Sequence, residues 1–289
     1  MSQLVWFDRT GKEIGTISAP GDYFNLQISP DGRSVLFDRV QPGLGTADLW
    51  TLDLARGVES RLTSERGSEV TPVWFPSGRS VAFGSDRGGG TPHLYRKDLG
   101  TGVEEELRPR GRQQQAMNVS PDGQTLAFVE RSANGNFDAF LMPLANPASA
   151  SPWLLSRFVK MFLRFSPDGR AIAYMANDTG SFEVYVAPLE APGAAITVSG
   201  GGGALPRWSR DGRELFYVTT DRVMSTPIRT TPSLELGTPV TLFRMDPKRR
   251  WDDFDVSADG RRFLAIVSQT RGAEQPVNVI ANWTAEQRR

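Results

Sequence analysis

The chain has 289 residues, of which 39% are hydrophobic and 10% aromatic, so it can bury a large core and is not a disordered polypeptide. Its 33 Lys and Arg residues balance its 33 Asp and Glu residues, which argues against broad electrostatic binding to nucleic acid or to anionic lipid. The absence of cysteine excludes disulfides, thiol nucleophiles and cysteine metal sites.

The first 17 residues contain two strand-like runs, 4–8 and 13–17, joined by a polar turn. They lack the basic stretch and the apolar stretch that make up a signal peptide. No run in the chain approaches the roughly 18 apolar residues of a membrane span. We therefore expect a soluble, monomeric chain that does not insert into a membrane. We place it in the cytoplasm, with the periplasm as the alternative if it serves a membrane-anchored system.

From residue 29 onwards, a Ser-Pro-Asp-Gly sequence or a close variant recurs six times, at intervals of 43–48 residues. Proline favours a turn, aspartate can bond its own backbone and glycine accepts a positive φ, so each copy predicts a tight turn. The glycines of the six copies are Gly32, Gly78, Gly123, Gly169, Gly212 and Gly260. Such a period indicates a repeat architecture with one supersecondary unit per copy. Because the aspartates recur with the turn, we expect them to serve its geometry and not catalysis.

Each repeat contains four short strand-like runs, the first ending in a bulky residue just before the turn. Four antiparallel strands per period is the pattern of a β-propeller blade, and no segment has the sustained periodicity of a helix. We therefore predict an all-β, six-bladed β-propeller of four-stranded antiparallel blades that forms a single domain over residues 1–289. The blades are expected at residues 22–63, 68–108, 114–156, 160–199, 204–244 and 251–284.

The two ends of the chain both offer a strand to the last blade. Residues 1–17 contain a third and a fourth strand with no hairpin before them, and they are in register with the third strands of the repeats. We expect this segment to close the ring by completing the last blade, which would protect exposed strand edges. Residues 278–283 also read as a third strand. The last blade therefore has five strands, or one of these strands packs outside it.

The turn sequences resemble a known family. Residues 165–170, Phe-Ser-Pro-Asp-Gly-Arg, are similar to the signature of the TolB-like, WD-repeat-like (PD40) propeller repeats of bacteria. Residues 207–217 and the closing residues 278–283 resemble the C-terminal propeller of some bacterial serine/threonine protein kinases and winged-helix regulators. This resemblance implies a non-catalytic sensor or protein-interaction module, the accessory part of a signalling or regulatory system, with a protein or peptide as its partner.

The motifs of common catalysts are missing from the sequence. There is no complete glycine-rich kinase loop, no His-Arg-Asp or Asp-Phe-Gly triplet, and no Gly-x-Ser-x-Gly elbow to present a serine. His93, the single histidine, begins a predicted strand where other repeats have Asp or Glu, so we interpret it as a polar strand start. We predict no catalytic residue. Three alternatives remain: a lyase or hydrolase acting at the channel rim, a fragment or relic related to the kinases that lacks the kinase domain, and a pure scaffold with no ligand.

Two further segments have compositions that suit ligands. Asp252, Asp253 and Asp255 concentrate carboxylates that suit Ca²⁺, although such a run is more often a solvated loop. The glycine-rich run 199–203 precedes a predicted strand and not the helix that a phosphate-binding loop requires, so we interpret it as an inter-blade loop. Apart from this Ca²⁺ candidate we expect no cofactor.

The main candidate site lies in the first strand of each repeat, just before the bulky residue. Five of the six residues at this position are polar or charged, namely Gln27, Asn118, Arg164, Arg207 and Asp255, and the sixth is Val73. Innermost strands line the central channel of a propeller, so these side chains are predicted to face it. Arg164 and Arg207 could together hold a small anionic ligand or a peptide carboxylate. The alternative is that the five side chains bond to water and to one another.

Overall fold

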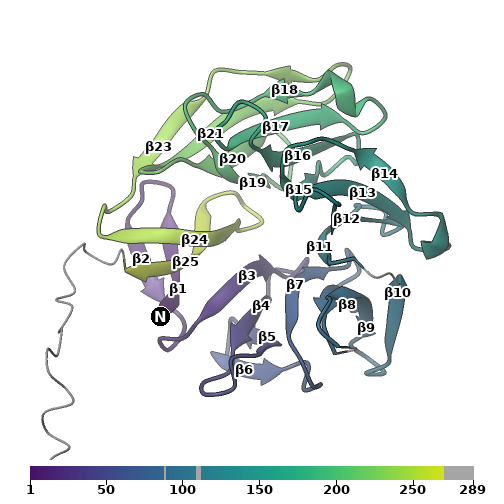
Figure 1. Ribbon diagram of the computed structural model, residues 1–289. Coiled ribbons are helices and arrows are strands. Elements are labelled where there is room, and N and C mark those ends of the chain that lie inside the picture. The colour runs from purple at the N-terminus through teal and green to yellow at the C-terminus, as the bar shows by residue number, and fades with distance from the viewer. Residues whose placement is uncertain (88, 109–111, 270–289) are drawn as a thin grey trace, which may run out of the picture.

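The structure is a computed structural model that describes residues 1–87, 89–108 and 112–269. Six antiparallel sheets lie like blades around a common centre, with strands β3, β7, β11, β15, β19 and β24 innermost (Figure 1). Two 3₁₀ turns, η1 (Pro147–Ser149) and η2 (Pro192–Ala194), are the helical elements within the described ranges, and no helix there is long and apolar enough to cross a membrane. The predicted all-β, six-bladed propeller is confirmed.

The blades are numbered in chain order, and the strands of each run from the centre outwards. Blade 1 consists of β3 (Tyr23–Ile28), β4 (Ser34–Val40), β5 (Ala47–Asp53) and β6 (Val58–Arg61). Blade 2 consists of β7 (Glu69–Trp74), β8 (Ser80–Ser85), β9 (His93–Asp98) and β10 (Glu104–Arg108). Blade 3 consists of β11 (Gln114–Val119), β12 (Thr125–Arg131), β13 (Phe137–Pro143) and β14 (Ser151–Leu154).

The later blades follow the same plan with one variation. Blade 4 consists of β15 (Lys160–Phe165), β16 (Ala171–Ala176), β17 (Glu183–Pro188) and β18 (Ile196–Thr197). Blade 5 consists of β19 (Ala204–Trp208), β20 (Glu214–Val218), β21 (Arg222–Arg229), β22 (Glu235–Leu236) and β23 (Val240–Arg244). Both β22 and β23 pair with β21, so two short strands share the outer position of this blade.

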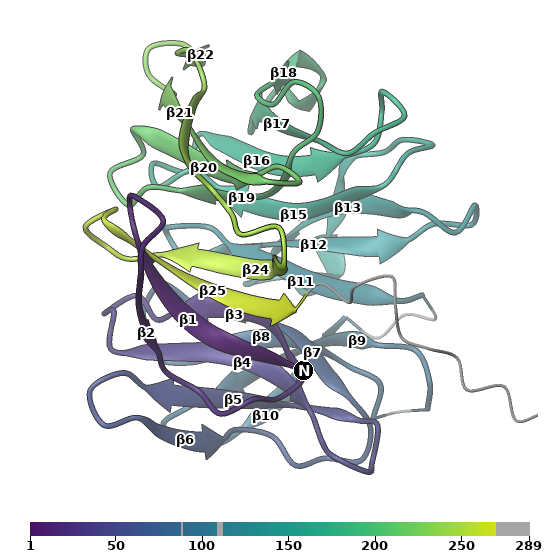
Figure 2. The same ribbon diagram turned by 90° about the vertical axis from the view of Figure 1, so that its left-hand side faces the viewer.

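Blade 6 joins the two ends of the propeller. It consists of β24 (Arg249–Val256), β25 (Arg262–Gln269), β1 (Ser2–Asp8) and β2 (Glu13–Thr16), in the order β24-β25-β1-β2. The purple β1 lies beside the yellow β25 in both views (Figures 1 and 2), and the two strands pair from Ser2 opposite Ser268 to Asp8 opposite Arg262. The prediction that the N-terminal segment completes the last blade is confirmed. The strand expected at residues 278–283, like the expected blade end at 284, lies outside the described residues.

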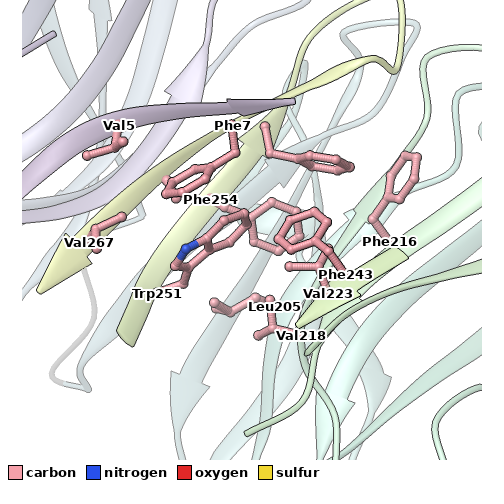
Figure 3. Close-up of a cluster of buried hydrophobic side chains, with 12 residues drawn as sticks. Val5, Phe7, Leu205, Phe216, Val218, Val223, Phe243, Trp251, Phe254 and Val267 are labelled. Carbon is pink, nitrogen blue, oxygen red and sulfur yellow. The ribbon is translucent and has the colours of Figure 1, made fainter. Parts of the chain in front are cut away.

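Aromatic packing reinforces this closure. Phe7 of β1 lies with its ring centroid 5.0 Å from that of Trp251 in β24, and Phe243 of blade 5 lies 5.8 Å from Trp251 (Figure 3). Phe254 and Phe263 belong to the same buried cluster. The closing strand therefore contributes to a core that blades 5 and 6 share, and backbone pairing and apolar burial act together.

Hydrogen bonds fix the recurrent turn between the first two strands of a blade. In blade 1 the Ser29 hydroxyl donates to Asp31 Oδ1 at 2.6 Å, and the same oxygen accepts the Arg33 N–H at 3.0 Å. These two bonds lower the pKa of Asp31, and Gly32 has a φ of +73°, where a side chain would be strained. The serine–aspartate bond recurs at Asp122, Asp168, Asp211 and Asp259. The turn aspartates thus have the structural role that their recurrence predicts.

The innermost strands are bulged rather than regular. The pairing of each with its neighbour shifts register once. In four blades a non-glycine residue two positions before the candidate position has a positive φ, namely Asn25, Thr71, Phe162 and Leu205. A bulge bends a strand and re-aims the side chains that follow it. Here it precedes the residues that face the channel.

Candidate functional site

A hollow of about 240 Å³ opens at the end of the channel where the Pro-Asp-Gly turns lie. We call it the channel mouth. All five candidate residues line it, together with Ile28, Trp74 and Trp208; the five are Gln27, Asn118, Arg164, Arg207 and Asp255. The structure therefore brings together, from five different blades, the residues that the sequence selects. The five side chains differ in their hydrogen bonds, and these bonds decide which side chain can still bind a ligand.

Three of the five residues join neighbouring blades. Gln27 Oε1 accepts the Trp74 backbone N–H at 2.9 Å, and Asn118 Oδ1 accepts the Phe165 backbone N–H at 2.9 Å. Asp255 Oδ2 accepts the backbone N–H of Ile28 at 2.8 Å, across the junction of blades 6 and 1. In each pair the side chain of one blade bonds the main chain of the next. These residues hold the ring together at its centre, and they bond main chain rather than one another.

Arg207 has a similar structural role. Its side chain is only 4% exposed, and its Nη2 donates to Asp253 Oδ1 at 2.6 Å. Its Nε donates to the Phe254 main-chain oxygen at 2.7 Å, and its Nη1 to the oxygen of Pro206 at 2.9 Å. Burial raises the pKa of the Asp253 carboxyl, although Arg207 beside it acts in the opposite direction. A carboxylate from blade 6 therefore already neutralises this guanidinium.

Arg164 differs from Arg207 in its partners. Its Nη1 donates to two main-chain oxygens, that of Met117 in blade 3 and that of Leu163 at 3.0 Å. No carboxylate oxygen within the described ranges comes within 4.0 Å of its guanidinium. Burial, followed by the positive charge of Arg207, lowers the pKa of Arg164 to about 9. An anion at this point would relieve both effects, so Arg164 is the member of the set with charge available to a ligand.

A buried carboxyl close to the central channel, that of Asp38, is not among the candidates selected from the sequence. Asp38 in β4 is 2% exposed and accepts the Asn25 amide N–H at 2.9 Å, and burial raises its pKa to about 7. Asn25 and Thr71 line a narrow hollow of about 40 Å³ in the channel, which Arg164 also borders. A sequence signal existed: the residues that match Asp38 in the second strands of the next repeats are Gly84 and Val129, so Asp38 is an isolated charge in an apolar pattern.

The three aspartates proposed for Ca²⁺ have partners within the chain, and two of them share one, since Arg207 pairs with Asp253 and also lies 3.9 Å from Asp255 Oδ1. Asp252 Oδ1 accepts from Arg250 Nε at 2.6 Å, Asp253 pairs with Arg207, and Asp255 accepts backbone N–H groups. Among the described residues there is no group of three or more His, Asp or Glu side chains arranged to hold a metal ion. The structure thus does not gather these three carboxylates around one point.

The other two polar segments have local partners. Gly201 N and Gly202 N donate to Glu183 Oε1 at 3.1 and 2.8 Å, so the amides of the glycine-rich run already surround a carboxylate of the same chain. This arrangement agrees with the interpretation of the run as an inter-blade loop. His93 Nδ1 lies 2.9 Å from Glu106 Oε1 on the neighbouring strand, away from the channel mouth.

Known proteins resemble the chain both in sequence and in fold. It is 25% identical over 202 residues to an uncharacterized protein of Agrobacterium fabrum, an alignment that covers 66% of this chain and 52% of that protein. It is 33% identical over 97 residues to the Tol-Pal system protein TolB of Anaeromyxobacter dehalogenans, covering 33% of this chain and 21% of TolB. The chain therefore spans about half the length of the first relative and about a fifth of the second.

Among solved structures, a putative TolB from Agrobacterium tumefaciens superposes with a TM-score of 0.74 at 17% identity, covering 94% of this chain and 99% of that one. An oligogalacturonate lyase in complex with manganese superposes with a TM-score of 0.61 at 13% identity, covering 92% and 82%. At such identities these likenesses show the fold alone.

A family model decides the relationship. The model described as the TolB beta propeller domain (PD40) matches residues 8–157, just over half of the chain. The expected closeness to kinase-associated propellers and winged-helix regulators finds no support in these comparisons. The chain belongs to the family of TolB β-propeller domains.

Proposed function

We propose that the chain is a non-catalytic binding module that holds a protein or peptide partner at the channel mouth, through a carboxylate of the partner bound to Arg164. The observation that carries this proposal is the guanidinium of Arg164, which lies in a hollow and has only main-chain oxygens as partners. Bonds between a guanidinium and a carboxylate are stronger than those between neutral groups, and they gain further where water is partly excluded.

The other residues of the channel mouth give this site its rigidity. Gln27 and Asn118 fasten neighbouring blades, and Arg207 is held by Asp253. A partner's carboxylate would therefore meet a preformed site and would displace none of these bonds. Preformed sites bind more tightly because little order has to be created on binding. Four of the five channel residues thus hold the ring together, and Arg164 is left for the partner.

The partner class follows from the shape of the site and from the family. The channel mouth is open and combines Trp74 and Trp208 with a single available cation, which suits a peptide end or an acidic side chain. A relative is named as a Tol-Pal system protein. By analogy we propose that this chain is the accessory, partner-binding part of a regulatory or signalling system.

The test is an NMR titration with two probes, acetylated pentaalanine with a free carboxyl end and the same peptide with an amidated end. Trp208 Nε1–H donates to the Arg164 main-chain oxygen at 3.0 Å, so its indole signal reports on the site. We expect the free acid to shift this signal saturably and the amide to leave it unchanged. Equal shifts with both peptides, or no shift with either, would contradict the proposal.

A second candidate function, an enzyme acting in the channel, is favoured by one observation. Asp38 has a pKa of about 7, close to the value at which a carboxyl can both give and take a proton under neutral conditions. An Asp38→Asn variant separates the two functions, because it would abolish turnover while leaving binding at Arg164 intact. The first substrate to assay is an oligogalacturonate, the substrate class named for the structurally similar lyase. Turnover that is lost in Asp38→Asn would favour the enzyme.

A further inference from the structure

A second hollow lies on the turn-bearing face, at the junction where blade 6 meets blade 1. Its volume is about 390 Å³, and we call it the seam pocket. Trp6, Ile28 and Leu54 provide apolar walls, and the turn around Ala258 borders it. Ile28 also lines the channel mouth, so the two hollows are neighbours on one face. None of the residues that carry the proposed function at Arg164 lines the seam pocket.

At three other junctions the proline of one turn covers the glycine of the next. A Cβ placed on Gly123 would lie 3.9 Å from Cδ of Pro76. The corresponding distances are 3.8 Å between Gly169 and Pro121, and 3.5 Å between Gly212 and Pro167. These are ordinary van der Waals contacts. A proline ring on the neighbouring glycine therefore recurs at three of the six junctions; at the junction of blades 1 and 2 the turn has Pro30, but no described atom lies within 4 Å of a Cβ placed on Gly78.

The junction of blades 6 and 1 lacks this contact. Blade 6 has Ala258 where four other turns have proline, and no described atom lies within 4 Å of a Cβ placed on Gly32. The junction of blades 5 and 6 also lacks a proline, and no described atom lies within 4 Å of a Cβ placed on Gly260; there Arg9 Nη1 donates to the Gly260 main-chain oxygen at 3.1 Å and to Glu214 Oε2 at 3.0 Å. The seam pocket includes Gly32, the position on which a proline ring packs at three other junctions.

The chemistry of the pocket suits a proline from outside. Trp6 is partly buried, and the guanidinium carbon of Arg262 lies 5.0 Å from its ring centre, which orients the indole. At the rim, Asp31 and Asp259 use their Oδ1 atoms for their own turns. An aromatic and aliphatic floor with a polar rim is the usual surface for extended, proline-containing peptides, whose stiff backbone loses little entropy on binding.

We propose that the seam pocket binds a proline residue of an extended partner peptide. The ring of that proline would take the place on Gly32 that Pro76, Pro121 and Pro167 take on their neighbouring glycines. The site goes beyond the proposed function, because it requires neither Arg164 nor a carboxylate. The proposed site is a second recognition element on the same face of the propeller. It lies at the junction of blades 6 and 1, next to the blade that the N-terminal strands complete.

The test uses hexaproline as probe and the Trp6 indole N–H signal as readout, assigned by its loss in Trp6→Phe. The decisive variant is Ala258→Pro, which gives blade 6 the Ser-Pro-Asp-Gly turn of blades 1, 3 and 4 and is designed to place a proline ring on Gly32. Proline is compatible with this turn, since Gly260 N donates to the Ser257 oxygen at 2.8 Å just as Gly32 N donates to that of Ser29. The matched control is Ala258→Ser, which leaves the pocket open. Hexaglycine is the control for the probe.

We expect hexaproline to shift the Trp6 signal saturably in the wild type and in Ala258→Ser, with at least a tenfold loss of affinity in Ala258→Pro. Circular dichroism and the remaining NMR signals verify that each variant is folded. No saturable shift in the wild type, an unchanged affinity in Ala258→Pro, or an equal shift with hexaglycine would each overturn the proposal. Because Arg164 plays no part, this outcome is independent of the titration at the channel mouth.

Discussion

Arg207 and Asp253 form a buried ion pair across the junction of blades 5 and 6, with Nη2 and Oδ1 2.6 Å apart. Arg164, one blade earlier in the chain, occupies the same position of its strand without such a partner. Two arginines that look equivalent in the sequence therefore have different roles. The guanidinium of the first is paired with a carboxylate of blade 6, and that of the second bonds main-chain oxygens.

This difference predicts unequal effects on stability. Arg207→Met would leave Asp253 buried and unpaired, and we expect it to lower the free energy of unfolding by about 3–5 kcal/mol. Arg164→Gln removes hydrogen bonds to main-chain oxygens only, and its expected cost is about 1 kcal/mol. Urea denaturation of both variants measures the difference. The double variant Arg207→Met, Asp253→Leu should recover much of the loss, and equal costs for the two single variants would contradict the assignment.

The five channel residues could be found from the sequence because the turn repeats fix their position in every blade. The hydrogen-bond partners of these residues could not be found from the sequence. Gln27 bonds Trp74, 47 residues away, and Arg207 bonds Asp253 in the next blade. A period says which strand position faces the channel, but contacts between blades depend on how the sheets are rotated against one another. The bulges before these positions add a further displacement that strand alternation does not predict.

Ring closure gives a second prediction. Deleting residues 1–17 removes β1 and β2, exposes the edge of β25 and takes Phe7 out of the cluster around Trp251. We expect aggregation or a strongly lowered melting temperature, because an unpaired strand edge is a template for association. The milder Phe7→Ala variant should cost about 3–5 kcal/mol. Size-exclusion chromatography and thermal denaturation are the measurements, and a monomeric, equally stable deletion variant would refute this account of the closure.

The sequence supported this closure because the N-terminal strands share the register of the repeats. It left the strand count of the last blade undecided, since residues 278–283 have the same pattern. Direct pairing of Val5 with Ala265 gives β1 the position next to β25. Long-range packing such as that of Phe7 against Trp251 accompanies this pairing, and the local pattern carries no information on it.

The raised pKa of Asp38 predicts how the stability of the fold depends on pH. Its pKa is raised to about 7 by burial, so between pH 4 and pH 7 the folded state binds a proton that the unfolded state has lost. This contribution to stability is complete below pH 4 and decreases as the pH rises through 7, by up to about 1.4 kcal/mol per pH unit. Denaturation at pH 5 to 8 should show a decline that is absent in Asp38→Asn. Parallel profiles for the two proteins would contradict it.

The substitution Ala258→Pro at the seam pocket is also expected to change the stability of the fold. Ala258→Pro restricts the unfolded chain at a position where the native turn accepts proline, so we expect it to stabilise the fold by about 0.4–1 kcal/mol. The comparison with Ala258→Ser separates this effect from the loss of alanine. A destabilised Ala258→Pro variant would mean that the turn of blade 6 differs from the turns that contain proline.

The central claim is that Arg164 binds a carboxylate of the partner, and the dissociation constant of acetylated pentaalanine with a free carboxyl end tests it most directly. NMR titrations of the wild type, Arg164→Gln and the exposed control Arg66→Gln give the three values. Loss of a charge-assisted pair of about 1.5–3 kcal/mol predicts at least tenfold weaker binding in Arg164→Gln and unchanged binding in Arg66→Gln. The same affinity in Arg164→Gln as in the wild type would contradict the account.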